Sequence, residues 1–291
     1  MSDTKHIDAV TGTATTGHEW DGIRELNTPL PRWWLYTMYA TIVWGLAYMV
    51  YYPAVPLIND ATKGMSGWNA RSEVVEEVGK LQALRGPMND KLAKTALADV
   101  TKDPDLLAFA TAAGSAAFAT NCAPCHGAGG QGAKGYPNLH ADRWIWGGKL
   151  ADIEYTIKHG IRWDADSNTR AGVMPAFGRD KILDPDQISQ VTDYVLSFTN
   201  RAPKGSNLAA GKKIYDDNCA ACHGDTGKGN RELGAPNLAT QVWLYGGDKA
   251  DIMERVRIGG GGVMPSWSGR LEPTTIKALA VYVHGFGGGE N

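Results

Sequence analysis

The pattern that most constrains this chain is Cys-x-x-Cys-His, which occurs twice. The two copies read Cys122-Ala-Pro-Cys125-His126 and Cys219-Ala-Ala-Cys222-His223. This spacing is typical of a c-type haem attachment site. Two thiols three positions apart add to the two vinyl groups of one porphyrin. The adjacent histidine is then held under the iron and ligates it through a ring nitrogen.

Three other readings of the pattern are a zinc half-site, a thioredoxin-like redox pair and a structural disulfide. A zinc site needs more ligands nearby, but all four cysteines of the chain lie in these two motifs. A thioredoxin-like pair does not require the histidine and would not be expected twice. The sequence therefore predicts two covalently bound c-type haems.

Each half of the chain also offers a methionine as the second axial ligand of its haem. Val173-Met174-Pro175 follows the first motif, and Val263-Met264-Pro265 follows the second. A lone methionine is often only core filler, but here Met-Pro recurs at the equivalent place in a repeat. A thioether favours Fe(II) and raises the reduction potential. An iron with six ligands has no free site for oxygen or peroxide, which favours electron transfer over chemistry on a substrate.

Residues 104–201 and 202–291 read as a tandem repeat of one helical plan. Asp103 is expected to cap the first helix, with Pro104 at its first position. Gly114 and Gly211 are expected to let the first helix approach the last one closely, near Tyr194 or Tyr282. The predicted fold class is all-α, with one N-terminal transmembrane helix and two tandem haem domains.

The repeat resembles the small single-haem cytochrome c fold. That resemblance covers roughly residues 104–200 and 205–286. In that family the proline after the haem motif, here Pro137 or Pro236, offers its carbonyl oxygen to the ligating histidine. Such a bond fixes the tautomer of the ring and raises its basicity.

A run without charges, Trp33 to Tyr52, precedes the repeat. A helix of this length spans about 30 Å, the thickness of a hydrocarbon core, and aromatic residues mark both of its ends. Residues 32–55 are therefore predicted to be a transmembrane helix rather than a buried core helix. No cleavable signal peptide is visible, so the helix is expected to act as an uncleaved anchor in the bacterial inner membrane, in contact with lipid.

The orientation follows from the haems, because bacterial c-type haem is attached outside the cytoplasmic membrane. Residues 1–31 are expected in the cytoplasm and the haem domains in the periplasm. Residues 56–103 read as a periplasmic helical linker, broken at Gly86-Pro87 and followed by a short helix from Asp90 to Ala98. The net charge of −2 gives no indication of nucleic-acid binding.

Over essentially the whole chain, the sequence resembles subunit III of the cbb3-type cytochrome c oxidases. The resemblance rests on the stretch Thr16 to Trp34, the following helix, both haem motifs and Gly-Gly-Val-Met-Pro-Ser-Trp267. It implies an electron-carrying, non-catalytic subunit of an oxygen-reducing, proton-translocating haem–copper oxidase. The implied donor is a cytochrome c or the cytochrome bc complex. The implied partners are a catalytic subunit, with haem b and a haem–copper centre, and a mono-haem cytochrome c subunit.

Three other functions compete with this interpretation. The cytochrome subunit of a periplasmic alcohol or aldehyde dehydrogenase is also a membrane-anchored protein with several haem domains, although those usually anchor at the C-terminus. A dihaem peroxidase or a gas sensor would need an open or displaceable ligand position, which the two methionines make unfavourable.

The first prediction concerns the number of haems. Two attachment motifs should give two haems that stay with the chain after denaturation, because thioether bonds are covalent. A pyridine haemochrome assay on purified protein checks this, and one haem per chain would contradict it.

Overall fold

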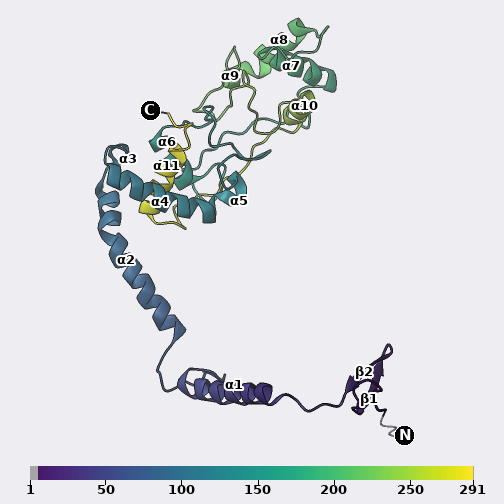
Figure 1. Cartoon of the computed structure of the whole chain (residues 1–291). Helices are drawn as coiled ribbons and strands as arrows, with labels where there is room; N and C mark the ends of the chain where they lie inside the picture. The colour runs from purple at the N-terminus through teal and green to yellow at the C-terminus, as the bar shows by residue number, and fades with distance from the viewer. Residues whose placement is uncertain (1–5, 291) are drawn as a thin grey trace. The chain divides into compact units, whose positions relative to one another are not determined.

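The computed structural model describes residues 6–290 and divides into two compact units, residues 1–84 and 85–291. Residues 1–5 of the predicted N-terminal segment and Asn291 of the second predicted haem domain lie outside the described residues. Figure 1 shows the elements in chain order. They are β1 (Thr15–Trp20), β2 (Ile23–Leu26), α1 (Arg32–Tyr51), α2 (Ala70–Lys94), α3 (Leu97–Val100), α4 (Pro104–Asn121), α5 (Ala123–His126), α6 (Leu150–His159), α7 (Pro185–Ser197), α8 (Leu208–Asn218), α9 (Ala220–His223), α10 (Lys249–Ile258) and α11 (Pro273–His284).

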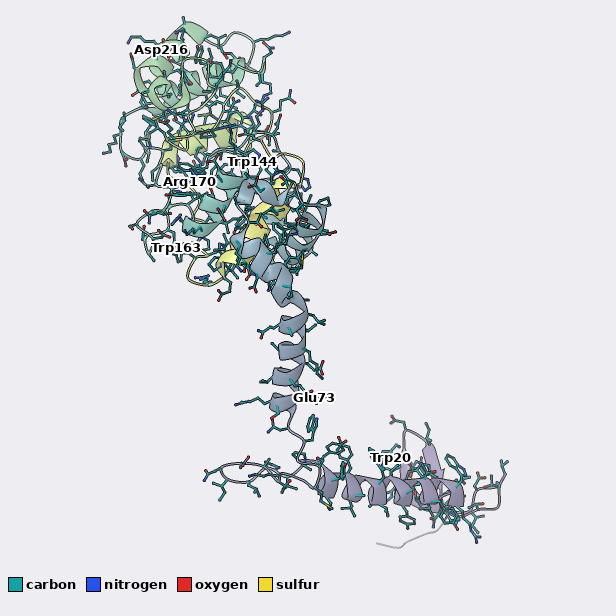
Figure 2. The ribbon with its side chains drawn as sticks, turned by 90° about the vertical axis from the view of Figure 1, so that its left-hand side faces the viewer. Trp20, Glu73, Trp144, Trp163, Arg170 and Asp216 are labelled. Carbon is teal, nitrogen blue, oxygen red and sulfur yellow. The ribbon has the colours of Figure 1, made fainter. Side chains whose placement is uncertain are left out.

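The first unit contains a β-hairpin that the all-α prediction missed. Strands β1 and β2 pair antiparallel, with Trp20 opposite Ile23. The two turn residues, Asp21 and Gly22, have φ angles of 50° and 82°. Asp-Gly with both φ angles positive is the preferred two-residue hairpin turn. The fold class is therefore corrected from all-α to mainly helical with one small hairpin, which carries Trp20 in Figure 2.

Helix α1 forms where the transmembrane span of residues 32–55 was predicted, and none of its side chains is buried. Within residues 6–290, however, no helix has both the length and the apolar character that crossing a membrane requires. Tyrosine, tryptophan and threonine take many positions of α1, and their polar groups lower its mean hydropathy. The predicted transmembrane span is therefore not confirmed.

Helix α2 corrects the predicted break in the linker. It runs from Ala70 through Gly86 and Pro87 to Lys94, so no separate helix begins at Asp90. Proline removes one backbone hydrogen bond and disfavours a helix interior. Here the surrounding residues are mostly good helix formers, and the helix continues through it. Figure 2 shows Glu73 near the beginning of α2, where its carboxylate accepts a 2.7 Å hydrogen bond from the Trp68 indole.

The end of α2 belongs to the second unit. Leu92 and Val100 are fully buried with Leu106 of α4 and Val281 of α11. The Lys277 ammonium donates to the carbonyl oxygens of Leu92, Ala93 and Thr95 at 2.8–3.2 Å. The last carbonyls of a helix lack intrahelical partners and carry partial negative charge, so a lysine stabilises this end.

The cap predicted at Asp103 is present, and a second helix of the second unit is capped in a similar way. The Asp103 carboxylate accepts from the backbone N–H of Leu106 at the start of α4, with Pro104 in the first turn. At the start of α7, Asp184 and Gln187 form a reciprocal capping box. These caps satisfy N–H groups that have no partner inside the helix.

The second unit contains two hydrophobic cores, which define two lobes. Lobe A consists of α4, α5, α6, α11 and the loop around Met264. Lobe B consists of α7, α8, α9, α10 and the loop around Met174. Figure 1 shows α4, α6 and α11 grouped together, and α7, α8 and α10 grouped together. Each lobe thus combines elements of both sequence repeats.

Two glycine contacts fix this exchange of helices. A Cβ on Gly114 of α4 would lie 2.6 Å from the Cβ of Tyr282 on α11. A Cβ on Gly211 of α8 would lie 2.9 Å from the Cβ of Tyr194 on α7. The predicted glycine–tyrosine contacts are therefore present, but each joins the first helix of one repeat to the last helix of the other.

The exchange has a physical reason in the connections. Only residues 198–207 join α7 to α8, and a short connection favours the direct pairing of consecutive helices. Once α7 and α8 are paired, α4 and α11 have no other equivalent helix to pack against and therefore pair with each other. The glycine and tyrosine positions are the same in both repeats, so either pairing satisfies the local packing.

The chain crosses between the lobes beside the two methionines. The N–H of Ile161 donates to the carbonyl of Met264 at 2.9 Å, and the N–H of Met264 donates to the carbonyl of Ile161 at 3.0 Å. In the other crossing, the N–H of Gly260 donates to the carbonyl of Met174 at 2.7 Å. Residues 160–173 and 259–263 are thus the segments where each repeat passes from one lobe to the other.

The close helix contact in lobe A predicts the effect of Gly114→Ala. The new Cβ would lie 2.3 Å from the Ala278 carbonyl oxygen, which forces α4 and α11 apart and costs about 1–3 kcal/mol of overpacking strain. The matched control is Gly79→Ala in α2, where the new methyl meets nothing within 4 Å and helix propensity improves. Thermal unfolding measures both, and equal melting temperatures for the two variants would contradict the packing.

Candidate haem sites

Each Cys-x-x-Cys-His motif ends in a histidine whose ring is oriented by a proline carbonyl. Nδ1 of His126 lies 3.2 Å from the Pro137 oxygen, and Nδ1 of His223 lies 3.0 Å from the Pro236 oxygen. A carbonyl only accepts, so the ring proton sits on Nδ1 and the lone pair is on Nε2. Burial lowers the pKa of both imidazoles, which favours the neutral, metal-ligating form.

The cysteines lie on the short helices α5 and α9 or at their N-caps, and no two of them form a disulfide. Cys122 and Cys219 are partly buried, and this burial raises the pKa of each thiol to about 11. Cys125 and Cys222 are exposed. Two thiols and a neutral imidazole with a free Nε2 are the groups that a c-type haem requires, so both motifs fit this cofactor.

The methionines lie in the opposite lobes from those that the repeat predicts. Met174 packs on the lobe B core together with Cys219, and Met264 packs on the lobe A core together with Cys122. The sequence order suggested Met174 for the first haem and Met264 for the second. The structure instead brings Met264 to the first motif and Met174 to the second.

Two equivalent glycines hold the methionine loops in these places. Gly160 follows α6 with φ of 69°, and a Cβ there would lie 2.4 Å from the Met264 carbonyl oxygen. Gly259 follows α10 with φ of 60°, and its Cβ would lie 2.5 Å from the Met174 carbonyl oxygen. Positive φ and this close approach both require glycine. The helix of one repeat therefore supports the methionine of the other.

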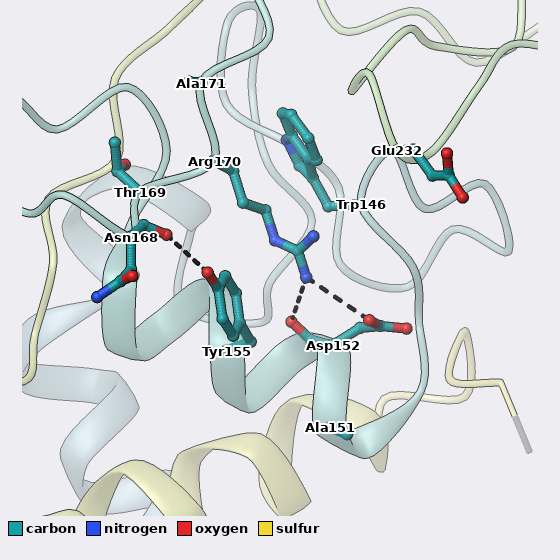
Figure 3. A pocket seen from close by; sticks show the side chains of 9 residues that line it. All are labelled: Trp146, Ala151, Asp152, Tyr155, Asn168, Thr169, Arg170, Ala171 and Glu232. Carbon is teal, nitrogen blue, oxygen red and sulfur yellow. Dashed lines mark hydrogen bonds and ion pairs between the residues drawn. The ribbon is translucent and has the colours of Figure 1, made fainter.

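Two arginines that the sequence analysis did not select lie on aromatic rings that are equivalent in the repeat. Figure 3 shows Arg170 between Trp146 and Tyr155, with its guanidinium directed at Asp152. In lobe B the Arg255 guanidinium lies 3.6 Å from the centre of the Tyr245 ring. No sequence signal marks them, because they do not occupy equivalent positions in the two repeats.

The remaining histidines of the haem-binding unit have protein partners. His159 lies 3.1 Å from the Asp166 carboxylate, and His284 lies 3.0 Å from the Glu290 carbonyl oxygen. Both ring nitrogens of His140 face backbone carbonyls, those of Gly129 and Phe286. Each of these three rings therefore has at least one nitrogen that faces a protein acceptor.

Three segments of the chain match described families. Residues 12–59 match the N-terminal domain of cytochrome oxidase-cbb3, FixP. Residues 111–199 match cytochrome c, and residues 206–283 match cytochrome C oxidase, cbb3-type, subunit III. Two cytochrome c domains imply that the chain binds haem c.

Similar proteins align over nearly the full length of the chain. The cbb3-type cytochrome c oxidase subunit FixP of Azorhizobium caulinodans is 56% identical over 285 residues, covering 98% of this chain and 96% of that protein. FixP of a Bradyrhizobium species is 52% identical over 291 residues, covering all of both chains. The CcoP subunit of Azospirillum brasilense is 53% identical over 293 residues, covering 98% of this chain and 99% of that protein.

The exchanged methionines predict which haem responds to each substitution. Cys125→Ala leaves one vinyl group of the first haem unreacted, which shifts its absorption band and labels it optically. In that background, Met264→His should lower the midpoint potential of the labelled haem, because imidazole favours Fe(III) more than a thioether does. Met174→His should lower the potential of the unlabelled haem. Spectroelectrochemical titration measures both, and the reverse assignment would contradict the exchange.

Proposed function

The chain belongs to the FixP/CcoP family, subunit III of the cbb3-type cytochrome c oxidases, and we propose that it is the subunit through which electrons enter its oxidase. In this proposal it accepts electrons from a cytochrome c or from the cytochrome bc complex. It delivers them toward the oxygen-reducing catalytic subunit, by way of the mono-haem cytochrome c subunit or directly. The chain itself catalyses no bond-making step.

The observation that carries the proposal is the composition of the two sites. In lobe A, thiols Cys122 and Cys125 would hold the first haem, with His126 and Met264 as axial ligands. In lobe B, the corresponding residues are Cys219, Cys222, His223 and Met174. The haem supplies an iron that changes between Fe(II) and Fe(III). With a side chain on each side of the iron, no position would be left for oxygen, which would separate this role from a peroxidase or a gas sensor.

The surrounding residues keep each site rigid. His223 is held by the Pro236 carbonyl, and the next loop is fixed by a 2.8 Å hydrogen bond from the Gly229 N–H to the His223 carbonyl. His126 has the matching contacts with Pro137 and with the Gly132 N–H, at 2.7 Å. Ligands that are held in one geometry before and after reduction suit an electron carrier.

The proposed location follows from haem attachment. Because bacterial c-type haem is attached outside the cytoplasmic membrane, we place both lobes on the periplasmic side of the inner membrane. The first unit supports a role in assembly, since Trp20, Ile23 and Leu30 are exposed and α1 buries none of its side chains. In the proposal, partner subunits and lipid cover these apolar groups.

The rival function is the cytochrome subunit of an alcohol or aldehyde dehydrogenase. The sites alone suit both functions, because both need only electron transfer. The N-terminal segment favours the oxidase, since residues 12–59 match the FixP-type N-terminal domain and the similar proteins are oxidase subunits over their whole length.

Two variants of the intact oxidase test delivery and assembly separately. Met174→His with Met264→His should keep both haems and co-purify with the catalytic subunit. Oxygen uptake with reduced cytochrome c should still fall at least about tenfold, because lower potentials make electron entry unfavourable. Trp20→Ser with Ile23→Ser should keep both haems and both potentials but reduce co-purification.

The role in electron delivery and the role in assembly can each be contradicted. Unchanged oxygen uptake in membranes lacking the whole chain would reject the role in electron delivery. Full co-purification of the hairpin variant would reject the assembly role of Trp20 and Ile23. A Val10→Ser variant is the control for the hairpin changes, because Val10 is 93% exposed and lies outside β1 and β2.

A further inference from the structure

Arg162 lies in the crossing segment of the first repeat, and its side chain contacts both methionine loops. Its Nε donates to the Gly262 carbonyl oxygen at 2.6 Å, and its Nη1 donates to the Gly172 carbonyl oxygen at 2.5 Å. These two glycines occupy equivalent places, each two residues before the methionine of its repeat. One guanidinium therefore joins the loops that carry Met174 and Met264.

The backbone of Arg162 has a conformation that arginine rarely adopts. Its φ angle of 51° lies in the left-handed region, which favours glycine because a Cβ is crowded there. The neighbouring chain holds this conformation, since the N–H of Arg162 donates to the Arg170 carbonyl at 2.8 Å. A strained backbone at a residue other than glycine points to a role for its side chain.

The second repeat has no arginine at the equivalent position. That position is Gly261, because Gly160 and Gly259 follow the equivalent helices α6 and α10. A Cβ on Gly261 would lie 2.6 Å from the Cζ atom of Arg162, so glycine leaves room there for the guanidinium. The arginine of one repeat thus occupies space that the glycine of the other repeat leaves free.

The guanidinium donates to these loops and not to a carboxylate. Within residues 6–290, no carboxylate forms an ion pair with Arg162, whereas the nearby Arg170 pairs with Asp152. A charged donor makes a stronger hydrogen bond to a carbonyl than a neutral donor does. The two bonds from Arg162 can therefore contribute to holding both loops in place.

We propose that Arg162 is a positioning residue for both haems, because it holds the loops of Met174 and Met264 against the lobes in which these methionines pack. The proposal rests on the proposed function, since it requires both methionines to ligate iron. A thioether is a poorer ligand of Fe(III) than imidazole is. The hold on each loop therefore decides how readily added imidazole displaces its methionine.

Tyr245 offers a comparison, because its hydroxyl binds only the loop of Met264. The hydroxyl oxygen accepts a 2.6 Å hydrogen bond from the N–H of Gly262, the residue whose carbonyl accepts from Arg162. The equivalent residue of the first repeat is Trp146, which has no hydroxyl. Loss of the Tyr245 hydroxyl should therefore loosen one loop, and loss of the Arg162 guanidinium should loosen both.

The test titrates imidazole into the oxidised full chain with both haems bound, in the Cys125→Ala background that labels the lobe A haem optically. The absorption change of each haem reports the displacement of its methionine. Arg162→Gln should increase the affinity for imidazole at both haems by about tenfold, which corresponds to one lost hydrogen bond from a charged donor at each loop. Tyr245→Phe should increase the affinity at the labelled haem alone.

Arg201→Gln is the matched control, because the Arg201 guanidinium also donates to a glycine carbonyl, that of Gly247, outside both methionine loops. Equal imidazole affinities in Arg162→Gln and Arg201→Gln, or an increase at one haem only in Arg162→Gln, would overturn the proposal.

Should Arg162→Gln lose a haem, Arg162→Lys is compared with Arg201→Lys. A single ammonium lacks the planar fork of arginine and does not reproduce its two separate donors. Imidazole should then still bind more tightly to at least one haem of Arg162→Lys, and equal affinities in the two lysine variants would overturn the proposal. A parent protein with fewer than two haems, or without the absorption band of a sulfur–Fe(III) bond, would instead reject the haem ligation of the proposed function.

Discussion

The structure of the haem-binding unit depends on the pairing of α4 with α11 and of α7 with α8. Each pair meets at a glycine that lets a tyrosine-bearing helix approach closely, Gly114 with Tyr282 and Gly211 with Tyr194. Because each pair joins two repeats, the chain must cross between the lobes twice. The crossings place each methionine loop against a helix from the other repeat. The assignment of axial ligands that we propose thus follows from helix packing and not from the order of motifs along the chain.

This arrangement makes the two lobes dependent on one another. Neither repeat contains both the histidine and the methionine that one lobe brings together, so under the proposed function a complete set of ligands would exist only when both repeats are folded. Lobe A needs α11 from the end of the chain to cover α4, which is a contact between residues distant in sequence and is expected to form late. The C-terminal tail adds a further contact between the two repeats in lobe A, because the Trp144 indole donates a hydrogen bond to the carbonyl of Gly288.

Much of this could be predicted from the sequence, for reasons that are local. The haem motifs, the caps at Asp103 and Asp184, and the close glycine contacts depend on residues near one another in the chain or on a repeated pattern. The hairpin also has a local signal, since Asp21-Gly22 between two short strands is a strong turn pattern, although the all-α prediction did not include it. Helix α2 continues through Pro87 because the helix formers around it outweigh one lost hydrogen bond.

The exchange of helices could not be predicted, because the two repeats present the same glycine, tyrosine and Met-Pro at equivalent positions. Nothing in such a pattern distinguishes pairing within a repeat from pairing between repeats, and only the three-dimensional path of the connections decides it.

Under the proposed function, each iron is ligated by residues from both repeats. A crystal structure of the haem-loaded chain, with iron atoms located by their anomalous scattering, measures this directly. We expect the iron of the haem bonded to Cys122 and Cys125 to lie between His126 Nε2 and Met264 Sδ, and the other iron to lie between His223 and Met174. Density joining the first iron to Met174 would contradict it.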